Sequence, residues 1–235
     1  MYRSNLSLVE YSNISEMFHL TRTPRERYNF TQLSTPPLRQ YLADVVDYYK
    51  LALSSDEPYI KYISFYHIME YFYDEVFKKK MVSDLRNKIT SPDFTYKNDD
   101  KVYEIAKFVN NRMRMDSKSG LGDEAESLKF VLMEYVPIEE LRARIATIDP
   151  TAETYYQTSK VVFCNAPSIA WSDVQGVYTQ LCKRIYATRN SLIHSKSGRK
   201  HELYHPYKDE PILRKEIPLV KAVAELIIIN SSSVL

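Results

Sequence analysis

The sequence predicts an all-α protein, a multi-helix bundle that follows a short irregular N-terminal segment. The chain of 235 residues holds only 4 Gly against 20 Tyr and 9 Phe, and tight hairpins and phosphate-binding loops are the structures that need glycine. A hydrophobic share of 44% with 26% charged residues is that of an ordinary globular domain with a sizeable core. Over most of the chain apolar side chains recur at steps of three and four, which indicates helices.

The first residues are the least regular part of the chain. Within 1–35 the stretch LSLVEY has the composition of a short strand, but RTPRERYNFTQ has no period, and Pro36 and Pro37 close the segment. We therefore expect two parts: an irregular N-terminal segment over 1–35 and one helical domain over 36–235.

Cysteine usage and hydropathy predict a soluble cytoplasmic protein. Cys164 and Cys182 are too few for a disulfide framework, so we expect buried free thiols in a reducing compartment. No apolar stretch follows a basic start at the N-terminus, and the most apolar run, 223–229, is too short to span a bilayer.

The helical patterns begin beyond the two prolines. Apolar side chains at three- and four-residue spacing predict a first helix over 38–52, which SSDEP breaks. The segment 58–80 (PYIKYISFYHIMEYFYDEVFKKK) is apolar around most of a helix circumference, so we expect one central core helix there. Further helices are predicted at about 100–114, 123–135 and 137–147.

The C-terminal third holds the most informative helix. The segment 148–167 is ambiguous, and a helix is then expected to open at Ser172, where SDVQ has the form of a capping box, and to run to about His194. A loop over 195–214 (SKSGRKHELYHPYKDEPILR) should lead to a last helix over 215–232.

Positive charge is concentrated in this region. The formal net charge of the chain is +2, yet 178–201 contains no acidic residue and six basic ones, which leaves −4 for the remainder: Lys183, Arg184, Arg189, Lys196, Arg199 and Lys200. Exposed charges act mainly within a Debye length, about 8 Å at physiological salt. A local basic patch of this kind can attract a polyanion, so nucleic acid or a nucleotide is a candidate partner.

Helix geometry separates the polar residues of this helix from its core face. A narrow core stripe is formed by Val174, Tyr178, Leu181, Ile185 and Leu192. Asn190, His194 and Lys183 point away from that stripe. Asn190 and His194 are one helical turn apart, close enough for the Asn190 amide to orient the His194 imidazole. Arg189 lies on the flank, where its stem can cover apolar surface while its guanidinium reaches the helix end.

The motif Arg189-Asn190-(Ser-Leu-Ile)-His194 resembles the Arg-polar-x(3–5)-His signature of the HEPN superfamily, the all-helical domains of many metal-independent ribonucleases. The downstream stretches IHSK, YHP and LRKEIPLVKAVAELI are similar to one bacterial branch, the ApeA-like HEPN group. Upstream, FYHIMEYFYDEVF resembles the core helix of that branch that bears a glutamate, here Glu70. In element order the resemblance covers about 38–229.

The resemblance implies a HEPN-type bundle, a homodimer and a metal-independent endoribonuclease that leaves a 2′,3′-cyclic phosphate. It further implies a toxin or effector in bacterial antiviral defence or a toxin–antitoxin system, with an antitoxin or sensor partner. Arg189 would bind the scissile phosphate, because its planar charged fork matches phosphate. His194 would transfer the proton, Asn190 would orient, and Glu70 would belong to the site. The RNA backbone would be held by Lys183, Lys196, Arg199 and Lys200.

No cofactor is expected. His201 and His205 have a metal-ligand spacing, but no acidic or Cys partner completes a set of ligands. No P-loop or Rossmann fingerprint is present.

Each candidate residue also has a plainer interpretation, which the sequence leaves open. Arg189 and His194 in a last helical turn can simply cap carbonyls and complement the helix dipole. Glu70 is either exposed or paired with Arg189, and Tyr66 and Tyr71 are expected in the core. The alternative functions are a catalytically silent HEPN module that binds RNA, nucleotide or a partner protein, and a helical scaffold whose basic loop meets an acidic partner.

Overall fold

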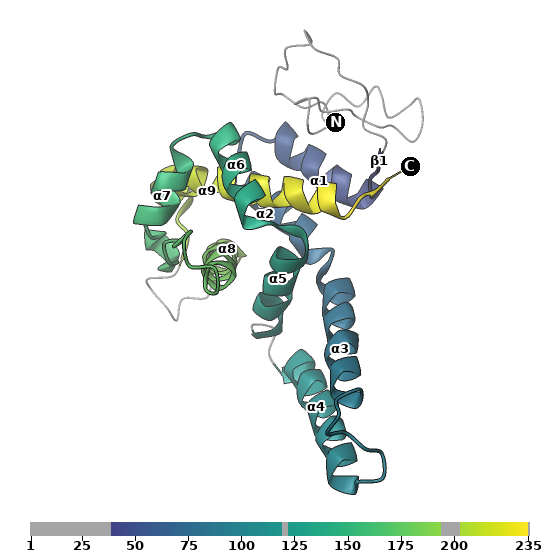
Figure 1. The fold of residues 1–235 in the computed structure, drawn as a ribbon. Coiled ribbons are helices and arrows are strands. Elements are labelled where there is room, and N and C mark those ends of the chain that lie inside the picture. Colours follow the sequence, from purple (N-terminus) through teal and green to yellow (C-terminus); the bar gives the residue numbers. More distant parts are fainter. Residues whose placement is uncertain (1–38, 119–121, 194–202, 235) are drawn as a thin grey trace.

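The computed structural model describes residues 39–118, 122–193 and 203–234, and it confirms the all-α prediction. Within these ranges the chain is mainly helical. The only strands there are β1 (Arg39–Gln40) and β2 (Ser233–Val234), which pair antiparallel and bring the two ends of the described chain together (Figure 1). The predicted segment 1–35 lies outside the described residues.

The body of the molecule is built around α2 (Pro58–Glu70). This helix packs against both α1 (Ala43–Ser54) and α9 (Pro206–Asn230), and α9 makes a smaller contact with α1 (Figure 1). Five of its side chains are almost completely buried: Tyr62, Phe65, Tyr66, Ile68 and Met69. A helix that is apolar around its circumference requires such burial on several sides, so the prediction of a central core helix is confirmed for 58–70.

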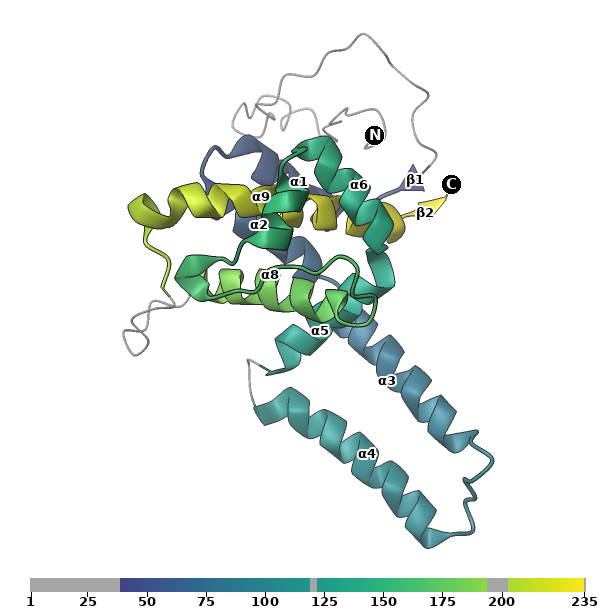
Figure 2. The ribbon, with the colours of Figure 1, turned by 60° about the vertical axis from the view of Figure 1, so that its left-hand side comes forward.

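The remaining helices of the body cover the other faces of this core. α8 (Val177–Ile193) lies against α5 (Gly122–Tyr135) and touches α2 (Figure 2). α6 (Ile138–Ile148) packs on α9. The segment that was ambiguous in sequence forms the short helix α7 (Ala152–Thr158) and a single 3₁₀ turn at Val162–Cys164.

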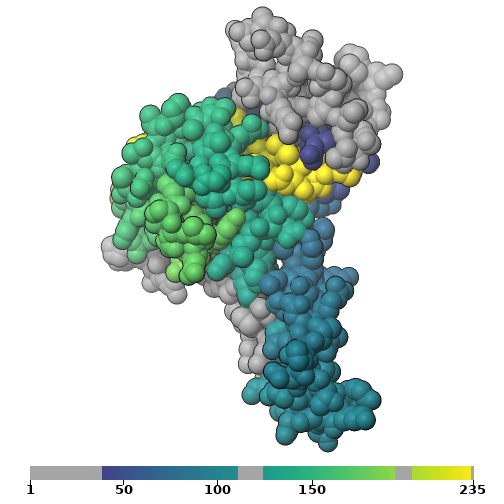
Figure 3. Space-filling view, viewed as in Figure 1, coloured from purple at the N-terminus to yellow at the C-terminus, as the bar shows by residue number. Residues whose placement is uncertain are grey.

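A helical hairpin projects from this body. α3 (Tyr73–Ile89) and α4 (Asp99–Lys118) form an arm that extends away from the other helices (Figures 1 and 3). Val76 is the only buried side chain of α3. The arm therefore contributes little to the core.

The predicted continuous helix over 58–80 is wrong, because the chain turns between α2 and α3. The amide of Phe72 bonds to the carbonyl of Met69 at 3.2 Å, a tight turn rather than a continued α-helix. Phe72 is buried, and its ring lies 5.2 Å from that of Tyr135. The aromatic first part of the segment, up to Phe72, thus packs in the body. The charged second part projects from the body, because it has only a narrow apolar face.

The predicted capping box at Ser172 is also wrong, since α8 begins at Val177. Asp173 caps the helix instead: its Oδ1 accepts from the amide of Gly176 at 2.9 Å, and its carbonyl accepts from Val177 at 2.8 Å. A β-carbon on Gly176 would collide with the Asp173 carboxylate in its present position, so a larger residue there would displace the capping side chain. Val174 precedes the helix and is 83% exposed, so it is no part of the core stripe.

The predicted loop over 195–214 is too long, because α9 begins at Pro206 and contains Pro218 in its interior. Proline normally breaks the hydrogen-bond ladder of a helix. Here the hydroxyl of Tyr156 enters the ladder: it accepts from the amide of Leu219 at 3.0 Å and donates to the carbonyl of Lys215 at 2.7 Å. A side chain from α7 therefore joins the amide that follows the proline to a carbonyl one turn earlier in the helix.

Single residues test the remaining predictions. Cys164 and Cys182 are free and buried, as expected. Tyr66 is buried, but Tyr71 is 44% exposed, so its assignment to the core was wrong. Among the helices of the described ranges, none has the length and apolar character needed to cross a membrane.

Candidate functional site

The guanidinium of Arg189 lies at a junction of three helices. It projects from the last two turns of α8, and its Nη2 donates to Glu70 Oε1 of α2 at 2.8 Å. Its Nη1 donates to Glu124 Oε2 of α5 at 3.2 Å and to the Oδ1 of the adjacent Asn190 at 3.1 Å. The Arg189 side chain is only 12% exposed. We call Arg189, Asn190, Glu70 and Glu124 the Arg189 cluster.

An aromatic ring supports the guanidinium from one side. The Cζ of Arg189 lies 5.1 Å from the ring centre of Tyr66, within cation–π range. The Tyr66 hydroxyl accepts a hydrogen bond from Tyr73 at 2.8 Å, and burial raises the pKa of both phenols. Both therefore remain neutral at physiological pH. The ring and the carboxylates together hold the guanidinium in one orientation.

Glu70 is itself held on its second oxygen. Its Oε2 accepts from His67 Nδ1 at 2.7 Å, and the His67 ring lies 5.1 Å from that of Tyr48. Burial alone would raise the pKa of Glu70, but the hydrogen bond from His67 and the positive charge of Arg189 outweigh it and lower that pKa. Glu70 is therefore ionised at neutral pH and paired with Arg189, which decides between the two interpretations that the sequence left open for it.

Arg189 stays charged although it is largely buried. Burial opposes its charge, but the adjacent Tyr66, Glu124 and Glu70 outweigh this and raise its pKa. Its Nε is buried and bonds to no acceptor among the described residues. One guanidinium between two carboxylates gives these three groups a formal charge of −1. The Arg189 cluster is therefore not part of the predicted positive patch.

Arg184, counted in the basic patch, is a core residue. It is fully buried and makes two hydrogen bonds, at 2.8 and 2.7 Å, to the buried carboxylate of Glu216 on α9. Its Nη1 donates to the carbonyls of Ser159 at 2.7 Å and Pro167 at 2.9 Å. Every charge here has a partner, so this arginine fixes α8 against α9 and the preceding loop rather than attracting an anion.

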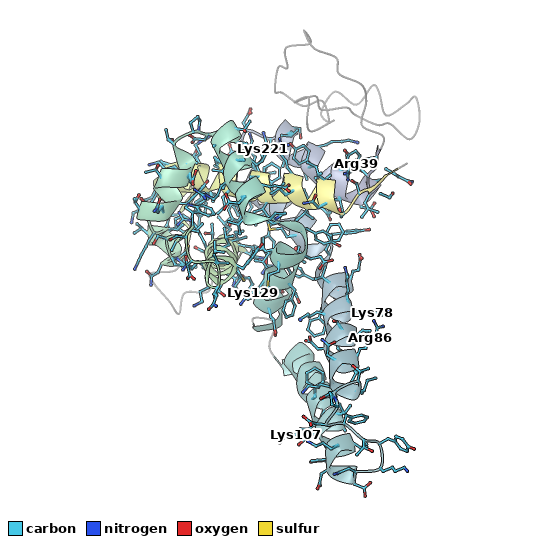
Figure 4. The ribbon with its side chains drawn as sticks, in the orientation of Figure 1. Arg39, Lys78, Arg86, Lys107, Lys129 and Lys221 are labelled. Atoms are coloured by element: carbon cyan, nitrogen blue, oxygen red, sulfur yellow. The ribbon has the colours of Figure 1, made fainter. Side chains whose placement is uncertain are left out.

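Lys183 is exposed, as the helical pattern predicts. Together with Lys129 of α5 (Figure 4) it lies near the thiol of Cys182, whose pKa burial raises to about 11 although both lysines act to lower it. Neither lysine pairs with an acidic side chain of the described residues. Lys183 is exposed and Lys129 is half-buried, so positive charge is present where α5 meets α8.

The structure therefore brings together some of the predicted site residues. Arg189, Asn190 and Glu70 are in contact, and Lys183 lies on the exposed side of the same helix. The amide of Asn190 accepts from Arg189, so in this structure it orients the guanidinium. Four predicted site residues lie outside the described residues: His194, Lys196, Arg199 and Lys200.

Two residues of the site were missed by the sequence analysis. Glu124 lies 65 positions before Arg189, and Tyr186 hydrogen-bonds to the side chains of both Asn190 and Glu124. Neither residue is part of a motif. The only usable signal for Tyr186 is its helical spacing, one turn before Asn190 on α8.

The described residues contain no group of three or more His, Cys, Asp or Glu side chains that could hold a metal ion. Comparison of the chain with protein-family models, with curated proteins and with solved structures found no match. The HEPN resemblance stays a prediction that rests on the sequence motifs.

Proposed function

We propose that this protein is a metal-independent endoribonuclease of the HEPN type, acting in the cytoplasm as a toxin or effector of bacterial antiviral defence or of a toxin–antitoxin system. The observation that carries the proposal is the placement of Arg189. Its guanidinium stands near the C-terminal end of α8, next to Asn190, and is fixed by Glu70 of the core helix α2, as the resemblance implies for a HEPN active site.

The proposed reaction needs only side-chain chemistry. A proton leaves the 2′-hydroxyl, the 2′-oxygen attacks phosphorus, and the bond to the 5′-oxygen breaks as that oxygen takes up a proton. The products are a 2′,3′-cyclic phosphate and a 5′-hydroxyl. His194 transfers a proton, and Arg189 stabilises the charge on the phosphate oxygens. Glu70 and Asn190 keep the guanidinium oriented, which lowers the entropy that phosphate binding costs.

RNA binding is assigned to cations around the end of α8. Lys183, which is exposed, and Lys129, which is half-buried, supply positive charge where α5 meets α8, and the stretch after α8 adds Lys196, Arg199 and Lys200. Such contacts to phosphate act without regard to sequence and weaken with added salt. In the proposed homodimer, two such sites face each other and share one RNA strand.

The test is cleavage of total RNA by purified protein in the presence of EDTA. Wild type should leave fragments that end in 2′,3′-cyclic phosphate, while Arg189→Ala and His194→Ala should each lose at least about 100-fold in rate, the order of magnitude for removing one group that stabilises transition-state charge. Arg214→Ala, which removes an exposed arginine paired with Glu210 on α9, should cleave like wild type. Intact RNA in every preparation would overturn the proposal.

One observation favours a second function, a catalytically silent HEPN module that binds RNA or a partner. Arg189 is largely buried and sits between two carboxylates, an environment that opposes an incoming phosphate. A silent module should bind RNA with strong salt dependence and produce no cyclic-phosphate ends. Fragment ends and salt-dependent affinity, measured on the same preparation, separate the two functions.

A further inference from the structure

The hydrogen bonds of Arg189 leave little room for a phosphate. A guanidinium has five N–H donors and binds phosphate best through two parallel bonds. Both N–H groups of Nη1 are used, by Glu124 and Asn190, and Glu70 takes one from Nη2. Nε is buried and accessible to no ligand. At most one N–H of Nη2 is open, so a bidentate contact to phosphate requires one partner to leave.

Glu124 is the partner best suited to leave. Its contact to Arg189 is the longest of the three, at 3.2 Å, and its side chain is 34% exposed. Glu70 is held at 2.8 Å on Arg189 and a second time by His67. Glu124 also has a second partner, Tyr186, so the choice rests on its longer bond to Arg189 and its greater exposure. Asn190 is the sequence neighbour of the arginine. Glu124 lies in the first turn of α5, ahead of the buried side chains Ser127 and Leu128 of that helix, so its side chain can leave Nη1 without moving them.

Charge supports the same choice. One carboxylate, Glu70, already neutralises the guanidinium, and Glu124 makes the arrangement negative in total. A negative group next to the binding donor repels a phosphate and competes for the same N–H. Loss of Glu124 from Nη1 would remove the repulsion and open a donor in one step.

We propose that Glu124 is an internal competitor of the substrate: its carboxylate occupies the place on Nη1 of Arg189 that a phosphodiester oxygen takes in the RNA complex. We call the arrangement with Glu124 bonded to Arg189 the closed form, and the arrangement without this bond the open form. Binding exchanges one oxygen ligand of Nη1 for another, with no covalent change. The identity of the anion as RNA rests on the proposed function, whereas the competition itself does not.

The test measures affinity for an RNA that cannot be cleaved, an oligonucleotide with 2′-O-methyl groups. Glu124→Ala should bind it about tenfold more tightly than wild type if the closed form outweighs the open form about ten to one. Glu134→Ala is the matched control, because Glu134 lies on the same helix, is 36% exposed and pairs with Lys79. It changes the net charge equally, so it reports the general electrostatic contribution, which should be small. Glu124→Gln, which keeps a neutral acceptor, should show a smaller gain.

The role of Arg189 is tested in the double variant Arg189→Ala/Glu124→Ala, where the gain should vanish. Thermal unfolding of each variant shows that it is folded, and Glu124→Gln serves if Glu124→Ala is not. The inference is wrong if the Glu124 variants bind no more tightly than Glu134→Ala, or if the gain survives without Arg189. Cleavage is scored separately: a gain in affinity without cyclic-phosphate ends in any variant keeps the inference and overturns the nuclease.

Discussion

At the scale of single residues, Arg184 and Arg189 lie five positions apart on α8 and have opposite surroundings. Arg184 is buried with bonds to a carboxylate and two carbonyls, which fixes its place in the fold. Arg189 is held between the carboxylate of Glu70 and the more exposed carboxylate of Glu124, and its buried Nε has no acceptor within the described part of the chain. An unsatisfied polar atom costs free energy and is uncommon in a purely structural arginine. This difference favours Arg189 as the functional residue of the pair.

The sequence alone could assign Arg189, Asn190 and Glu70 to one site because a motif and a resemblance named them. It could not separate Arg184 from Arg189, since both are basic residues of one helix. Their partners Glu216 and Glu70 lie 32 and 119 positions away. Burial and pairing across such separations depend on tertiary packing, which a local pattern does not contain.

The carboxylate of Glu70 should make stability depend on acid. Its pKa in the folded protein is lowered from an ordinary value of 4.5, so its ionised form stabilises the fold above that pH, and this contribution is lost as the pH falls through the folded-state pKa. We expect Glu70→Gln to reduce the free energy of unfolding at pH 7 and to have much less effect near pH 3. Denaturant unfolding of both proteins at the two pH values measures this. An equal loss at both would show that the charge of Glu70 has no part in it.

At the scale of elements, helices with one apolar face were predictable and irregular ones were not. The patterns at 123–135 and 137–147 coincide closely with α5 and α6, because each helix packs by one stripe. The turn between α2 and α3 falls inside a continuous aromatic run, and only the packing of Phe72 on Tyr135 places it. In α9, Pro218 predicts a helix break. The helix continues because the hydroxyl of Tyr156, from α7, bonds to the amide of Leu219 and the carbonyl of Lys215.

Tyr156→Phe tests whether the hydroxyl of Tyr156 stabilises α9 at Pro218. The substitution keeps the ring but leaves the amide of Leu219 and the carbonyl of Lys215 without the hydroxyl that joins them. An unsatisfied buried polar group costs about 1–3 kcal/mol, so the free energy of unfolding should fall by at least about 1 kcal/mol in denaturant titrations. Tyr207→Phe, at an exposed phenol in the first turn of the same helix, should leave it unchanged. A loss of similar size in both variants would contradict the proposed bridge.

At the scale of the whole molecule, the arm and the Arg189 cluster are connected through the chain. Glu70 ends α2 directly before the turn into α3, and Glu124 lies in the first turn of α5, the helix that follows α4. The two residues whose carboxylates bond to Arg189 thus lie directly before and directly after the segment that forms the arm. Three cations, Lys78, Arg86 and Lys107, are distributed along the arm (Figure 4).

The arm should open independently of the body, and hydrogen exchange followed by mass spectrometry can show it. Local opening costs little where few apolar side chains are buried, and Val76 is the only buried side chain of α3, whereas α2 and α9 are buried along most of their length. Amides of α3 and α4 should thus exchange much faster than those of α2 and α9. Peptides from the end of α8 should stay protected, because Arg189 is fixed to α2 through Glu70 when the arm opens. Equal protection of arm and body would mean that the arm is held by contacts beyond those of one chain, and exchange at the end of α8 as fast as in the arm would mean that Glu70 does not fix the cluster.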